Sequence, residues 1–282
     1  MAEAAAIILA GGRSSRMGSP KAALDWHGST LLRRVTGLLA RVVDGPIIVV
    51  RAPGQDLLDI AEGTELVSDA REGHGPMQGI AAGLAAIGGR APVAYVSSTD
   101  VPLLHPAFVR RVIDGFDSEV DVVLPEVGGY RQPLAAGYRG DLLATVEELI
   151  AAQRMRPAFL FERCRVRRLD DETMLKDRSL ARFDPTLASV SNLNAPADYE
   201  RAHALPAPEI HVELFGPLAT QTVAPRRKTA RAWTLGQLAS AVGLELREHI
   251  VAALNGDQIS RDPHLPLVAG DSVGFMVADA GG

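Results

Sequence analysis

The sequence predicts an α/β protein with a doubly wound, mostly parallel sheet, followed by a small α+β domain. Over residues 5–124, short apolar runs rich in β-branched residues alternate with segments of helical periodicity. The runs are apolar throughout, as is typical of strands buried on both faces. The stiff segment Leu-Pro-Ala-Pro at 205–208 then precedes a region with a different pattern. We therefore expect a first domain over 1–204, a linker at 205–208 and a second domain over 209–282.

The elements of the first domain follow from these periodicities. Five apolar runs predict strands, at residues 5–9, 46–50, 65–68, 93–97 and 120–124. Four segments with helical spacing lie between them, at residues 30–43, 57–61, 76–87 and 106–116. Because strands alternate with helices, the strands should run mostly parallel, with helices on both faces of the sheet.

The alternation loosens after residue 124. The pattern there predicts an extended segment at 131–136 and helices at 142–152 and 157–162. It then predicts a late strand with a turn at 189–194 and a further helix at 196–203.

The second domain begins with a strand of different character. Ile210, Val212 and Leu214 alternate with His211 and Glu213, which indicates a half-exposed strand. A helix is expected at 234–242 with Thr234 as its N-cap, and strands at 251–257 (ending in a turn) and 271–277. The expected order of strand, strand, helix, strand, strand is that of a small α+β domain.

Composition excludes several classes of function. The chain has 282 residues and a formal net charge of −5, so a nucleic-acid partner is not expected. Its single cysteine, Cys164, excludes an internal disulfide and a cysteine-cluster metal site. We expect no signal peptide, because the N-terminus lacks a basic n-region, and no membrane segment, because the apolar run at 4–10 is too short to span a bilayer. A cytoplasmic location fits these features.

The segment at 9–21, LAGGRSSRMGSPK, directly follows the first predicted strand. Two glycines allow a sharp turn and a close approach of the backbone to a ligand. Free backbone N–H groups in such a loop bind phosphate oxygens. Arg13, Arg16 and Lys21 add positive charge, which suits the same anions. The segment therefore predicts binding of a nucleoside triphosphate, and a solvated surface loop is the alternative.

Two carboxylates fall at the same sheet edge as this loop. Asp69 and Asp100 each follow a predicted strand, and ligands of doubly wound sheets bind beyond the carboxyl ends of the strands. Mg²⁺ favours one or two carboxylates together with phosphate oxygens. Asp100 is therefore a candidate metal ligand, although an Asp before Pro102 is also typical of a turn. Asp69 could hold hydroxyl or base groups of a nucleotide, or simply end its strand.

Four motifs resemble those of molybdenum cofactor guanylyltransferase, in the order found in that family. They are LAGGxSxRMGxxK at 9–21, Asp69 with Gly-Pro-Met-Gln-Gly at 75–79, Asp-Val-Pro at 100–102 and Asn-Leu-Asn-Ala-Pro at 192–196. The resemblance implies a Rossmann-like nucleotidyltransferase that uses Mg²⁺ and GTP, with molybdopterin cofactor as the acceptor. It implies Arg16, Lys21 and Asp100 as catalytic residues and Asp100 as the metal ligand. The implied nucleotide-binding residues are Leu9, Ala10, Gly11, Gly12, Ser14, Ser15, Arg16, Gly18, Lys21, Asp69, Gly75, Pro76, Gly79 and Asp100.

Other residues leave alternatives open. Asn192 and Asn194 could contact phosphates or metal, or could form a turn. Arg51 stands where the family often has Asn, and Met77-Gln78 replaces its usual Leu-Ala, which leaves the base pocket undecided. Ala10-Gly11-Gly12 matches guanylyltransferases better than cytidylyltransferases. The remaining alternatives are cytidylyl transfer, transfer to another phosphorylated acceptor, and an inactive nucleotide-binding scaffold.

The second domain resembles small sulfur-carrier proteins of the ubiquitin-like β-grasp fold, such as the small subunit of molybdopterin synthase. The resemblance rests on Phe215-Gly216, Leu254-Asn255-Gly256, the segment 270–273 and the final Gly281-Gly282. It implies a thiocarboxylate on that Gly-Gly tail. It also implies an ATP-dependent activating enzyme, the molybdopterin synthase large subunit, or both as protein partners. A simple tail without such a role is the alternative.

Overall fold

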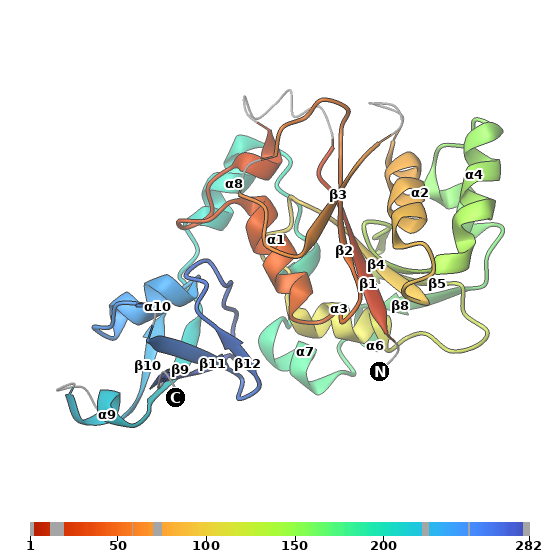
Figure 1. Cartoon of the computed structure of the whole chain (residues 1–282). Coiled ribbons are helices and arrows are strands. Elements are labelled where there is room, and N and C mark those ends of the chain that lie inside the picture. The colour runs from red at the N-terminus through yellow and green to blue at the C-terminus, as the bar shows by residue number, and fades with distance from the viewer. Residues whose placement is uncertain are drawn as a thin grey trace. The chain divides into compact units, whose positions relative to one another are not determined.

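A computed structural model of the chain describes residues 3–11, 20–57, 59–69, 75–221, 226–247 and 249–278 (Figure 1). The chain divides into two compact units. The first comprises Met1–Trp26 and Thr30–Tyr199, and the second His27–Ser29 and Glu200–Gly282. The predicted linker at 205–208 lies within the second unit.

An eight-stranded sheet forms the centre of the first unit. Its strands are β1 (Ala4–Leu9), β2 (Ile47–Arg51), β3 (Thr64–Ser68), β4 (Val93–Ser98), β5 (Val122–Val127), β6 (Tyr130–Arg131), β7 (Ala135–Arg139) and β8 (Val166–Asp170). Their order is β3-β2-β1-β4-β7-β5-β6, and β8 pairs with β5. The β1–β2, β1–β4, β2–β3 and β5–β8 pairs are parallel, whereas β7 runs antiparallel to β4 and β5. The sheet is therefore mixed, which corrects the expected mostly parallel one.

Helices cover both faces of this sheet (Figure 1). The helices of the first unit are α1 (Leu31–Ala40), α2 (Pro76–Ile87), α3 (Pro106–Ile113), α4 (Leu143–Ala151), α5 (Pro157–Phe161), α6 (Asp171–Met174) and α7 (Arg178–Phe183). The next helix, α8 (Pro196–His203), begins in the first unit and ends in the second. Ala5 and Ile7 of β1 share one buried cluster with residues of α2 and α4. Since successive strand residues point to opposite faces, Ala4, Ala6 and Ile8 are buried on the other face.

Two glycines allow α2 to lie directly against β1. A Cβ atom on Gly79 would be 2.8 Å from Leu9 Cδ2, and one on Gly83 would be 2.5 Å from Ile7 Cγ2. Real side chains at these positions would push the helix away from the sheet. This packing holds the N-terminal end of α2 beside the end of β1, where the first glycine motif starts.

Several predicted elements differ from the structure. The described residues of 57–61 are not helical: Asp59 has a φ of 58° and its carboxylate binds Arg33 instead. Residues 189–194 form no strand, because the chain there makes the short 3-10 helix η3 (Ala188–Val190) and then continues irregularly. The helix expected to reach 116 ends at Ile113. Strand β8 and helices α6 and α7 were not predicted, since their apolar positions are few and widely spaced.

The second unit contains a five-stranded sheet of its own. Its strands are β9 (Glu209–Leu214), β10 (Arg227–Arg231), β11 (Ile250–Leu254), β12 (Gln258–Ser260) and β13 (Ser272–Val277), with helices α9 (Pro217–Gln221) and α10 (Leu235–Ala241). The order is β10-β9-β13-β11-β12, and only the central β13–β9 pair is parallel among these described strands. Thr234 caps α10 as predicted, since its hydroxyl accepts a hydrogen bond from Gln237 N at 3.3 Å. The expected alternation along β9 is confirmed, with Ile210, Val212 and Leu214 buried.

In the part of the chain that the structure describes, every helix is too short or too polar to cross a bilayer.

The thiol of Cys164 is half-buried in the first unit, against the core between the sheet and α4. Burial, with a smaller contribution from Asp121, raises the pKa of this thiol to about 11. The thiolate is the reactive form, so less of it exists at neutral pH than in an ordinary cysteine. At pH 8 we expect Cys164 to react with a disulfide reagent about a hundredfold more slowly in the folded chain than in the denatured chain. Equal rates in the two states would contradict this.

Candidate functional site

A cavity of about 690 Å³ lies at the edge of the first sheet where β1, β2 and β4 end. Its volume is in the range of small-molecule binding sites. Eleven of the predicted site residues line it: Leu9, Ala10, Gly11, Lys21, Asp69, Gly75, Pro76, Gly79, Asp100, Asn192 and Asn194. The fold therefore brings together, at one sheet edge, residues as far apart in the sequence as Leu9 and Asn194.

The other predicted residues cannot be placed. Gly12, Ser14, Ser15, Arg16 and Gly18 lie outside the described residues, and so do Gly281 and Gly282. Their roles remain predictions.

Lys21 and Asp100 form an ion pair at the centre of the described part of the cavity. Lys21 Nζ, at the start of η1 (Lys21–Ala23), lies 2.6 Å from Asp100 Oδ2. Ser98 Oγ, at the end of β4, donates to Asp100 Oδ1 at 2.6 Å. The Asp100 side chain is only 13% exposed. Two donors on separate oxygens hold this carboxylate in one orientation in the lining of the cavity.

The backbone of Asp100 also anchors the asparagine motif. Leu193 N donates to Asp100 O at 2.9 Å, which holds Asn192 and Asn194 beside the end of β4. Both asparagine side chains are exposed and line the cavity. The motif comes from far along the chain, and one hydrogen bond fixes its place in the site.

A buried polar cluster supports the segment that leads to this motif. Ser189 Oγ donates to Asp184 Oδ2 at 2.6 Å and accepts from His105 N at 2.9 Å. Asp184 also accepts from the backbone N–H groups of Ala188 and Ser189. Burial raises the pKa of the Asp184 carboxyl, and these hydrogen bonds counteract part of that rise. The cluster ties η3 to the start of α3.

We expect Ser189→Ala to lower the free energy of unfolding by about 1–3 kcal/mol. The substitution removes the hydrogen bonds that Ser189 Oγ makes to the backbone N–H of His105 and to the Asp184 carboxylate. Ser189 is fully buried, whereas the nearby Ser191 is exposed. Urea unfolding of the two alanine variants provides the measurement, with Ser191→Ala as the control. A Ser189→Ala variant as stable as the control would contradict the structural role of the cluster.

The ends of β1 and β2 are tied together beside the cavity. Gln55 Oε1 accepts from Ala52 N at 3.0 Å, and Gln55 Nε2 donates to Ala10 O at 3.2 Å. Arg51 donates to Gln55 O at 3.0 Å, so it supports this turn. A Cβ on Gly11 would be 3.0 Å from Ala52 N, which explains why glycine starts the loop there.

Gln55, Arg131 and Gln132 also line the cavity, and sequence reasoning did not place them there. Gln55 lies in a turn without a recognisable motif. Arg131 and Gln132 belong to a segment that was predicted only as extended.

The donor set around Asp100 suits Mg²⁺. Each Asp100 oxygen accepts one hydrogen bond, and a carboxylate oxygen has a further lone pair for a cation. Asn192 and Asn194 line the same cavity, and an Asn side chain carries a carbonyl oxygen, which is also a hard donor. Among the described residues, no three His, Cys, Asp or Glu side chains cluster as a metal site, and a site completed by phosphate oxygens does not require three.

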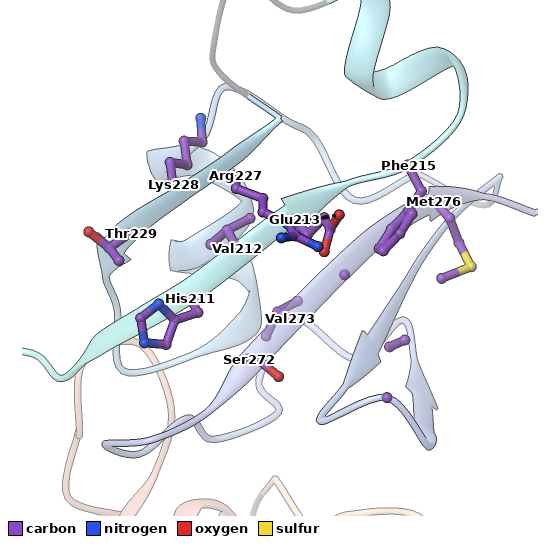
Figure 2. Close-up of a pocket in the computed structure, with 13 residues that line it drawn as sticks. His211, Val212, Glu213, Phe215, Arg227, Lys228, Thr229, Ser272, Val273 and Met276 are labelled. Atoms are coloured by element: carbon purple, nitrogen blue, oxygen red, sulfur yellow. Dashed lines mark ion pairs between the residues drawn. The ribbon is translucent and has the colours of Figure 1, made fainter.

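A second cavity, of about 600 Å³, lies in the second unit over one face of its sheet (Figure 2). Glu213 on β9 pairs with Arg227 on β10 at 3.1 Å. The ring of Phe215 lies over Gly274 of β13, where a Cβ atom would be 2.7 Å away. Figure 2 shows Phe215 and Met276 at one end of this face and His211 and Ser272 at the other.

Comparison with known proteins gives consistent results for the first part of the chain. The family model described as the MobA-like NTP transferase domain matches residues 6–169. A molybdenum cofactor guanylyltransferase from Desulfosudis oleivorans is 32% identical over 200 residues, covering 70% of this chain and 93% of that protein. A probable molybdenum cofactor guanylyltransferase from Mycobacterium avium is 38% identical over 151 residues, covering 52% of this chain and 75% of that protein.

A solved structure is similar as well. The crystal structure of molybdopterin-guanine dinucleotide biosynthesis protein A from Archaeoglobus fulgidus aligns with a TM-score of 0.58 and 25% identity. The alignment covers 71% of this chain and 96% of that protein.

Proposed function

Because the chain belongs to the family of MobA-like NTP transferase domains, we propose that it transfers GMP from GTP to molybdopterin cofactor. The family resemblance of the first part is confirmed, and the chain is a nucleotidyltransferase. The relatives named as guanylyltransferases support GTP as the substrate and molybdopterin cofactor as the acceptor. The observation that carries the proposal is the Lys21–Asp100 pair at the centre of a cavity lined by four separate motifs.

The proposed reaction is a substitution at phosphorus. An oxygen of the acceptor's terminal phosphate attacks the α-phosphorus of GTP, forming a new P–O bond. The bond between the α-phosphorus and the bridging oxygen to the β-phosphate breaks, and pyrophosphate leaves with that oxygen. The reaction requires no covalent intermediate on the protein, so positioning and charge neutralisation supply the catalysis.

The chain's own residues perform the positioning. Lys21 contributes a mobile positive charge at the triphosphate, and it can exchange its contact with Asp100 for one with phosphate oxygens. The turn held by Gln55 presents Ala10 and Gly11 beside the start of α2. Asp100 would hold Mg²⁺, which when bound neutralises charge on phosphate oxygens. We infer that Arg16, from the glycine motif at 9–21, adds a second cation.

Pyrophosphate release measured with each of the four ribonucleoside triphosphates tests the proposal. With molybdopterin cofactor as acceptor, we expect release with GTP to exceed release with CTP, ATP or UTP. Faster release with CTP would identify a cytidylyltransferase instead. Nucleotide binding without release from any triphosphate would identify the inactive scaffold.

We further propose that the second unit is a sulfur carrier of the β-grasp type. The order β10-β9-β13-β11-β12, in which the first and last strands pair in parallel at the centre, supports this fold. The final Gly281-Gly282 suits a tail that enters a narrow active site, since glycine carries no side chain. An ATP-dependent activating enzyme would convert the tail to a thiocarboxylate, which the molybdopterin synthase large subunit would then use.

Intact-mass analysis tests the carrier proposal. The chain is incubated with the host's activating enzyme, ATP and a sulfur donor. We expect a mass increase that corresponds to replacement of one oxygen by sulfur, and no increase when Gly282 is deleted. An unmodified tail, under conditions that convert a known carrier, would contradict the proposal.

A further inference from the structure

The strand order divides the cavity into two halves on either side of Asp100. The ends of β1 and β2 and the start of α2 line one half, and this half carries Gly11, Lys21 and Gln55. Strand β4 lies between β1 and β7, and Ala135 at the start of β7 pairs with Ser97 near the end of β4. Residues 131–135, which run from the end of β6 to the first residue of β7, therefore line the second half. Because Gly11 and Lys21 of the glycine motif lie in the first half, we place the nucleotide and its leaving pyrophosphate there.

An attacking acceptor must occupy the side of the α-phosphorus that is opposite the leaving group. With the nucleotide on the β1 side, that position falls in the half lined by residues 131–135. The acceptor carries a phosphate, so a positive side chain is expected there. Among the described residues that line the cavity, Lys21 and Arg131 are the two cations, and Arg131 belongs to this half.

The guanidinium of Arg131 is held through Nε, and its two Nη groups are available for a ligand. Its Nε donates to Glu126 Oε1 at 3.3 Å, across the β5–β6 pair. Among the described residues, neither terminal amino group of this guanidinium has a hydrogen-bond partner. The side chain is 46% exposed. A guanidinium held through Nε can present both Nη groups to two oxygens of one phosphate.

The backbone around Arg131 is well supported. Gln132 N donates to Pro125 O at 2.9 Å, and Ala135 N donates to Gln132 O at 3.1 Å. Tyr138 Oη donates to Pro133 O at 2.7 Å from a buried ring. These hydrogen bonds fix residues 131–135 before a ligand arrives, so ligand binding costs less conformational entropy in this segment.

We propose that Arg131 is an acceptor-binding residue, whose two Nη groups bind the terminal phosphate of the acceptor and orient it toward the α-phosphorus. This inference rests on the proposed function and assigns the second half of the same cavity.

The test measures binding separately from turnover. The dissociation constant of molybdopterin cofactor, freshly released from a molybdoenzyme, is determined for the whole chain and for Arg131→Met, together with that of GTP. We expect Arg131→Met to weaken cofactor binding about ten- to a hundredfold and to change GTP binding by less than about twofold. Arg131→Lys should fall between, because it keeps the charge but lacks the planar fork.

Arg168→Met is the matched control. Arg168 also pairs with Glu126, at 3.6 Å, but it does not line the cavity. Unchanged cofactor binding in Arg131→Met would overturn the inference, as would equal weakening in the control. Absence of pyrophosphate release from the unaltered chain, with Arg131-dependent binding intact, would contradict the proposed function and leave this inference supported.

Discussion

Asp100→Ala should reduce pyrophosphate release by at least about a thousandfold, with the fold intact. The substitution removes the carboxylate that Lys21 and Ser98 orient at the centre of the cavity. It removes the ion-pair partner of Lys21 and the carboxylate that we propose as the Mg²⁺ ligand. Steady-state kinetics at saturating Mg²⁺ measure the effect, and circular dichroism with a thermal melt checks the fold.

Asp117→Asn serves as the control for Asp100→Ala. Asp117 is also ion-paired, to Arg167, but its side chain is 47% exposed and does not line the cavity. We expect this variant to retain full activity. Full activity in Asp100→Ala would refute the proposed mechanism.

Lys21→Ala should lower kcat/KM for GTP by about a hundred- to a thousandfold. Lys21 is the cation nearest to Asp100 among the described residues, and no positive side chain replaces it in this variant. Lys21→Arg keeps the charge on a bulkier, planar group, so partial activity is expected. Separate measurement of kcat and KM distinguishes loss of nucleotide binding from loss of transition-state stabilisation.

The two substitutions should not be additive. Lys21 and Asp100 are in direct contact, so removal of either one already breaks the pair. We expect the double variant to lose little more activity than Asp100→Ala alone. If the losses of activity in the two single variants multiply in the double variant, the expectation is wrong, and Lys21 and Asp100 act independently during turnover.

Local pattern predicted much of the first unit. The helix at Pro76–Ile87 has the bounds that its periodicity predicts, and the helix at Pro196–His203 does as well. Each has a proline at its start, and the pattern of apolar residues sets the rest. Both helices are determined by neighbouring residues, which is the information that a sequence carries directly.

Long-range contacts decided the elements that local pattern missed. Residues 57–61 have apolar residues suited to a short helix, but Asp59 binds Arg33 of α1 and adopts a positive φ. The partner of Asp59 cannot be recognised from spacing along the chain. Strand β7 has a local cause instead: the two-residue turn at Gly128 and Gly129 reverses the chain between β5 and β6, and β7 continues in that reversed direction.

The sequence by itself determined the strand-helix alternation of the first unit and the motifs that follow its strands. Because parallel strands end at one edge, it also predicted that Gly11, Asp69 and Asp100 lie near one another. The tertiary structure decided the pairing of Lys21 with Asp100 and the attachment of Leu193 to Asp100. It also placed Arg131 in the cavity, since the order β4-β7-β5-β6 brings that side chain to the site edge. Side-chain and backbone partners far apart in sequence depend on strand order, and strand order follows from packing of the whole chain.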